Sequence, residues 1–114
     1  MYGISIMKTT AIISTEELAS LRLLGQRIRL CRLRRNLTQQ ELAERMGVGR
    51  MAIVSLEKGR PGVSLLTLLK ALTVFDHSYT ARLGDLLAAD PVGEGIEIVT
   101  GRQRAAHVPG FADF

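Results

Sequence analysis

The sequence predicts an all-α fold of five helices, followed by one short β-strand. Apolar residues recur with helical period from about residue 15 to residue 88, and each run has its own start or stop signal. Only the segment after residue 90 changes character, because β-branched and polar residues alternate there. With 114 residues, the chain is expected to form one domain around one modest core.

The first helix is expected from Ser14 to Arg35. Ser14 and Glu17 have the spacing of a capping box, in which the hydroxyl accepts a backbone N–H and the carboxylate reaches back to the cap. Asn36 should end the helix, because asparagine tolerates the left-handed conformation of a helix C-terminus. The side chains expected to face the core are Leu21, Leu24, Ile28 and Cys31.

Two short helices are expected next, joined by a tight turn. Thr38 and Glu41 form a second capping box, and Gly47 should end the helix that they open. The turn leads into a helix over residues 50–57. Its side chains expected to face the core are Ile53 and Leu56.

The fourth and fifth helices complete the helical part. Ser64 is the expected cap of a leucine-rich helix, and a further helix should cover residues 78–88. The pair Asp90 and Pro91 is expected to close this region. The chain is therefore divided into an N-terminal arm, a helical domain, a strand segment and a flexible tail, at residues 1–13, 14–90, 91–101 and 102–114.

The predicted strand lies between Glu94 and Gly101 and needs a partner strand. One candidate is the same strand of a second copy, and the other is the segment of residues 3–13. The second copy is preferred, which predicts a homodimer. The residues expected to form the dimer contact are Ile96, Ile98 and Val99.

The two short helices carry the most informative motif. Residues 37–48 have the sequence LTQQELAERMGV, and residues 56–59 have the sequence LEKG. Two short helices with a tight turn can project one helix outward while the other braces it. This pattern resembles the Cro/repressor helix-turn-helix family, also called the XRE family, over residues 24–72. The resemblance implies a five-helix lambda-repressor-like domain that places residues 50–57 in the major groove of double-stranded DNA.

The helix over residues 50–57 has an outward face at the places where family members touch base edges. The expected base-contacting residues are Arg50, Met51, Val54 and Ser55. Arginine can bond guanine, serine can bond several bases, and apolar side chains can contact thymine methyl groups. The expected phosphate-contacting residues are Thr38, Gln39, Arg34, Arg35, Lys58 and Arg60. For the last four, a solvated surface role is an equally good interpretation.

The resemblance also implies one structural ion pair and reveals one departure. An arginine at the position of Arg32 pairs, in the family, with the glutamate at the position of Glu57. If this pair is buried, it supports the fold rather than DNA contact. Gly49 stands where the family commonly has a serine or threonine cap, so one phosphate contact is expected to be lost.

Composition and single residues exclude several other classes. The formal charge of +4 favours an anionic partner, either nucleic acid or a membrane surface. No apolar run is long enough to span a bilayer and no secretory signal is recognised, so a cytoplasmic protein without a membrane role is expected. Cys31, His77 and His107 lack companions at metal-ligand spacing, and no catalytic set is found. We therefore expect no metal, no cofactor and no enzyme activity.

A second resemblance, to HipB-type antitoxins, involves the sequence ISTEELA of residues 13–19 and the predicted strand of residues 96–99. It implies a homodimer that binds a palindromic operator, represses its own operon and binds a HipA-like kinase toxin. Two alternatives remain open. One is a stand-alone phage-type or metabolic repressor without a toxin, and the other is a protein-interaction module that does not bind DNA.

Overall fold

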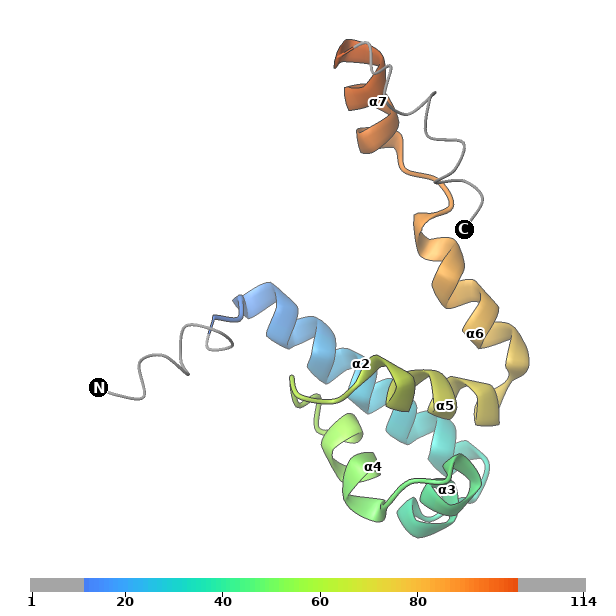
Figure 1. Ribbon diagram of the computed structural model, residues 1–114. Coiled ribbons are helices and arrows are strands. Elements are labelled where there is room, and N and C mark those ends of the chain that lie inside the picture. Colours follow the sequence, from blue (N-terminus) through green and yellow to red (C-terminus); the bar gives the residue numbers. More distant parts are fainter. Residues whose placement is uncertain (1–11, 101–114) are drawn as a thin grey trace. The chain divides into compact units, whose positions relative to one another are not determined.

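The computed structural model describes residues 12–100, and every regular element in that range is helical (Figure 1). The described residues divide into two compact units, residues 12–80 and 81–100, with the boundary inside α6. The elements are α2 (Thr15–Arg34), α3 (Gln39–Met46), α4 (Arg50–Glu57), α5 (Leu65–Phe75), α6 (His77–Gly84), the 3-10 helix η1 (Asp85–Leu87) and α7 (Pro91–Thr100). The five predicted helices are thus confirmed, although the fifth ends as a 3-10 turn.

The predicted capping boxes are present at α2 and α3. The Ser14 hydroxyl accepts the Glu17 N–H at 2.9 Å, and the Ser14 N–H donates to Glu17 Oε1 at 3.0 Å. Thr38 and Glu41 repeat this arrangement at the start of α3. Asn36 has a φ of 56°, the left-handed conformation that ends α2 as predicted.

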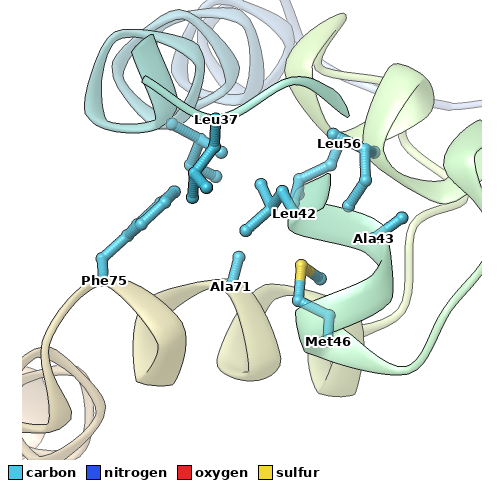
Figure 2. Packing of buried hydrophobic residues seen from close by; sticks show 9 residues of the cluster. Leu37, Leu42, Ala43, Met46, Leu56, Ala71 and Phe75 are labelled. Carbon is cyan, nitrogen blue, oxygen red and sulfur yellow. The ribbon is translucent and has the colours of Figure 1, made fainter. Parts of the chain in front are cut away.

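The core of the first unit lies between α2, α3, α4 and α5. In Figure 2, Leu42 and Met46 of α3 point toward Ala71 of α5, and Phe75 lies beside Leu37. The buried apolar residues are Ile28, Leu37, Leu42, Ala43, Met46, Ile53, Leu56, Ala71 and Phe75. Full burial of one such leucine or isoleucine contributes about 1.5–3 kcal/mol, so this cluster holds the two short helices in place.

Two glycines let α4 and the loop after it lie directly on the backbone of α2. A Cβ atom on Gly25 would come within 2.5 Å of the Glu57 carbonyl oxygen, and one on Gly59 within 2.7 Å of the Arg22 Cα. Gly59 also has a φ of 70°, which favours glycine. The end of α4 is therefore fixed by contact between backbones.

The prediction of a strand at Ile96, Ile98 and Val99 is wrong, because these residues lie in α7. The Asp90 carboxylate accepts the Gly93 N–H at 3.1 Å, and Pro91 is the first helical residue. Proline has no N–H to lose at that position and its φ suits a helix, so this pair starts a helix rather than closing the helical region. Alternation of β-branched residues alone did not outweigh that start signal.

The other predicted segments lie mostly outside the described residues. The N-terminal arm is described only at residues 12 and 13, and the tail of residues 102–114 is not described. Among the described helices, none combines the length and the apolar character that crossing a membrane requires.

Candidate nucleic-acid interface

The helix α4 has a buried face and an exposed face. Ile53, Leu56 and Glu57 are buried, whereas Arg50 and Met51 are exposed, with 57% of Met51 accessible. The other two predicted base-contacting residues, Val54 and Ser55, are half-buried at the edge of this face. The side chains that could reach into a groove of a nucleic-acid duplex are therefore concentrated at the start of α4.

The start of α4 has no side-chain cap. Gly49 occupies the N-cap position with φ −79° and ψ 156°, and no side chain there bonds a free N–H of the first turn. A Cβ atom at Gly49 would meet nothing within 4 Å. This position therefore has room for the hydroxyl-bearing residue that is common in the family.

The start of α3 carries a negative charge that the cap holds in place. The Thr38 N–H donates to Glu41 Oε1 at 2.8 Å, and the Thr38 hydroxyl accepts the Glu41 N–H at 3.0 Å. The backbone hydrogen bond from Thr38, followed by its hydroxyl, lowers the pKa of the Glu41 carboxyl from its ordinary value of 4.5. Thr38 itself is exposed, in the place predicted for a phosphate contact.

Arg32 and Glu57 are brought together inside the first unit. Arg32 Nε donates to Glu57 Oε2 at 2.6 Å, and Arg32 Nη2 donates to Glu57 Oε1 at 3.0 Å. Arg32 Nη1 also donates to the Leu37 carbonyl oxygen at 2.8 Å. The pair therefore connects α2, the loop before α3 and the last residue of α4.

The Gln39 side chain lies between α3 and α4. Its Nε2 donates to Glu57 Oε1 at 3.2 Å, and its Oε1 accepts from Arg50 Nη1 at 3.2 Å. We expected Gln39 to contact phosphate, and the bridge to Arg50 was not predicted. Helix spacing could not reveal it, because the two residues are 11 positions apart and meet only through tertiary packing.

Ser55 of α4 is in contact with Arg60 of the loop that follows the helix. Arg60 Nη1 donates to Ser55 Oγ at 3.3 Å, and Lys58, the C-cap of α4, is exposed. Ser55 and Arg60 line a groove of about 610 Å³ beside α4. The residues that line it are Met51, Ala52, Ser55, Arg60, Gly62, Val63, Ser64 and Thr67.

The two adjacent arginines at the end of α2 differ in their surroundings. Arg35 Nη1 donates to the Cys31 carbonyl oxygen at 2.9 Å, and its Nη2 donates to the Phe75 carbonyl oxygen at 3.1 Å. Its guanidinium also lies over the Phe75 ring, 5.0 Å from the centroid. Arg34 is exposed on the last turn of the helix. Arg35 thus ties α2 to α5, and its phosphate contact stays a prediction.

The charges of the two units have opposite sign. Residues 12–80 contain 11 lysines and arginines against six aspartates and glutamates, whereas residues 81–100 contain one against four. The unit that contains α3 and α4 is therefore the positive part of the described chain. Among residues 12–100, no three histidine, cysteine or acidic side chains gather in a way that could hold a metal ion.

Comparison with known proteins agrees with this geometry. A family model described as "Helix-turn-helix" matches residues 28–79. Two proteins of Archaeoglobus fulgidus, each named "Uncharacterized HTH-type transcriptional regulator", are 44% and 42% identical over 64 residues, which span 56% of this chain and 86% and 84% of theirs. A protein of the same name from Methanothermobacter thermautotrophicus is 63% identical over 30 residues, 26% of this chain and 44% of its own. The chain belongs to the Cro/C1-type (XRE) helix-turn-helix family.

Proposed function

We propose that this protein is a transcription regulator that binds double-stranded DNA with the exposed face of α4. The observation that carries the proposal is that Arg50 and Met51 are exposed on a helix whose opposite face is buried. The positive charge of the unit around them suits a polyanion. The archaeal relatives are named transcriptional regulators, which also supports a role in transcription.

In this proposal α4 enters the major groove and α3 lies across the phosphate backbone. Arg50 bonds the acceptor edge of guanine, Ser55 bonds a neighbouring base, and Met51 and Val54 contact thymine methyl groups. We assign the phosphate contacts to exposed polar residues at the end of α2, at the start of α3 and after α4. Those residues are Thr38, Arg34, Lys58 and Arg60.

Repression follows from a homodimer on a palindromic operator. Two copies of α4 related by a two-fold axis contact half-sites about one helical turn apart. We assign the dimer contact to α7, where Val92, Ile96 and Val99 are exposed at positions that share one helical face. Ile98 is also exposed but lies off that face. A ten-residue helix is marginal alone in water, so a partner for this face would stabilise it.

A stand-alone repressor is favoured over an antitoxin that binds a HipA-like kinase toxin. The resemblance to HipB-type antitoxins had two parts, the sequence of residues 13–19 and a C-terminal strand. Because residues 91–100 form α7, only the first part remains. Co-purification with the product of an adjacent kinase-like gene would favour the antitoxin again.

The test is selection of bound duplexes from a random DNA pool, followed by titration at several salt concentrations. We expect a palindromic site, and a fall of log affinity with log salt with a slope of several units. Replacement of Arg50 by alanine should relax one guanine position in each half-site. No binding at all would instead support a protein-interaction module, and binding without sequence preference would overturn the assignment of α4 to base contacts.

A further inference from the structure

The outward side of α2 carries an exposed stripe of leucines. Leu23, Leu30 and Leu33 are accessible to 46%, 46% and 43%. The buried side of the same helix includes Gly25 and Ile28, and the end of α4 lies directly against Gly25. By helical spacing, the leucines lie on the opposite side of α2 from these two residues. The stripe therefore faces away from the core and from α4.

The stripe has the seven-residue repeat of a coiled-coil contact. Leu23 and Leu30 take the a position of the heptad, and the d positions are taken by Ala19, Gln26 and Leu33. These five residues are all exposed, and we call them the α2 seam. Two heptads are too few for isolated helices to pair, but α2 is already held by the core of the first unit. Only a partner helix would have to become ordered on binding.

Arginine occupies both positions that border the seam. The e positions are Arg27 and Arg34, and the g positions are Arg22 and Arg29. All four are exposed, and within residues 12–100 none of their guanidinium groups makes a hydrogen bond or an ion pair. No aspartate or glutamate occurs between residues 18 and 40. The seam is therefore an apolar strip between two rows of positive charge.

We propose that the α2 seam is a docking surface for an amphipathic helix of another protein, with apolar residues at its a and d positions and acidic residues at e and g. The apolar side chains would pack between the three leucines, and the carboxylates would pair with the arginines. Opposite charges at e and g select the partner. This surface goes beyond the proposed DNA-binding function and does not depend on it.

The charge pattern disfavours this chain itself as the occupant. Two α2 seams placed together would bring arginine against arginine at the e and g positions. The acidic helix α7 does not have the required pattern, because Glu94 lies opposite the apolar face that includes Ile96. Residues 1–11 and 101–114 together contain three basic residues and one acidic residue. The acidic helix is therefore assigned to another protein.

The test uses a synthetic peptide of three heptads as the probe, with leucine at a and d and glutamate at e and g. The control peptide has lysine at e and g and is otherwise identical. In isothermal titration calorimetry with the full chain, the glutamate peptide should bind at least tenfold more tightly than the lysine peptide. Its affinity should fall as salt is added, because the expected ion pairs are exposed.

Two variants of α2 separate the apolar part of the contact from the charged part. Leu30→Ser should reduce the affinity for the glutamate peptide about tenfold, the loss expected when one leucine is no longer buried. Its matched control is Leu66→Ser, because Leu66 is 60% exposed but lies on α5. Arg27→Glu should reduce the affinity about threefold. Arg45→Glu makes the same change of net charge on α3 and should leave the affinity unchanged.

Other substitutions in the seam keep the test open and simple. Arg34 also has the proposed phosphate contact, so it is left unchanged. Thermal unfolding of each variant identifies loss of folding, and Leu23→Ser repeats the test if Leu30→Ser does not fold. A lipid surface is a weaker candidate than a helix, because the seam is narrow and has no aromatic side chain. Vesicles of phosphatidylglycerol are the probe for that alternative.

Five results would overturn the proposal. No binding of the glutamate peptide, or equal binding of the two peptides, would show that the seam does not select an acidic helix. Equal losses in Leu30→Ser and Leu66→Ser would place the peptide elsewhere. A dimer that Leu30→Ser dissociates in sedimentation experiments would make a second copy the occupant, and vesicle binding that Leu30→Ser abolishes would make it a membrane. Because these measurements contain no DNA, their outcome is separate from that of the proposed function.

Discussion

Arg32 and Glu57 form a two-point ion pair with both side chains almost fully buried, 7% and 4% exposed. Removal of one partner leaves the other charge buried without compensation. We expect Glu57→Ala to lower the free energy of unfolding by about 3–5 kcal/mol. Urea denaturation followed by circular dichroism measures this loss.

The double variant Arg32→Met with Glu57→Leu is the control for that prediction. Because the double variant removes both charges and fills their places with apolar side chains of similar size, it should be more stable than Glu57→Ala alone. A double variant that is less stable than the single variant would show that the pair contributes a large net attraction instead.

Gly25 is predicted to be required for the contact between α2 and α4. The Cβ of Gly25→Ala would lie 2.5 Å from the Glu57 carbonyl oxygen, so the helices must separate. We expect a loss of about 1–3 kcal/mol, despite the better helix propensity of alanine. The control is Gly84→Ala at the end of α6, where an added Cβ meets nothing within 4 Å and stability should stay the same or rise. Equal thermal unfolding of the two variants would contradict the prediction.

Gly49 and Gly47 flank the same turn but should respond oppositely to substitution by serine. Gly49 has an N-cap backbone conformation and room for a side chain, so Gly49→Ser should add a cap and stabilise the protein by about 0.5–1 kcal/mol. Gly47 has a φ of 72°, so Gly47→Ser should cost about 1 kcal/mol. Differential scanning calorimetry checks both signs, and a gain at both positions would contradict the argument.

Arg34 and Arg35 are predicted to affect different properties. Arg35→Ala loses two bonds to carbonyl oxygens and the Phe75 ring contact, and should lower stability by about 1 kcal/mol. Arg34→Ala should leave stability unchanged and reduce the slope of log affinity against log salt by about 0.9, the value for one phosphate. If Arg35→Ala reduced the slope of log affinity against log salt as much as Arg34→Ala does, Arg35 would also be a phosphate contact.

The capping of α3 predicts a dependence of stability on acid pH. Because hydrogen bonds from Thr38 lower the pKa of Glu41 in the folded state, the carboxylate stabilises the fold above its unfolded pKa. That contribution is lost as the pH falls from about 4.5 through the lower folded pKa. The stability difference between the wild type and Glu41→Gln should therefore shrink over this acid range in urea titrations. A constant difference would show that the charge of Glu41 is not involved.

Local signals in the sequence were sufficient to predict most of the first unit. The hydroxyl and carboxylate pairs at Ser14 and Thr38 form capping boxes, and the left-handed Asn36 ends α2, because these features depend only on residues a few positions apart. The outward position of Arg50 also follows from helical spacing. Such local features require no knowledge of the tertiary fold.

The features that could not be predicted depend on contacts between distant segments or on competing local signals. The bond from Arg50 to Gln39 and the bonds of Arg35 to α5 require the packed structure. At α7, glycine and β-branched residues favoured a strand, but Asp90 and Pro91 supply a helix start of the kind that serine supplied elsewhere. The same capping rule applied to this pair would have favoured a helix.

The backbone contacts of Gly25 and Gly59 also make the domain suitable for engineering. Main-chain contacts and the buried residues of α4 hold this helix against the rest of the domain. The exposed side chains at positions 50 and 51 therefore contribute little to the packing of α4. A library that varies only these two exposed positions should therefore yield folded proteins throughout. Retargeting of the domain to new nucleotide sequences can proceed from that pair, with the scaffold left as it is.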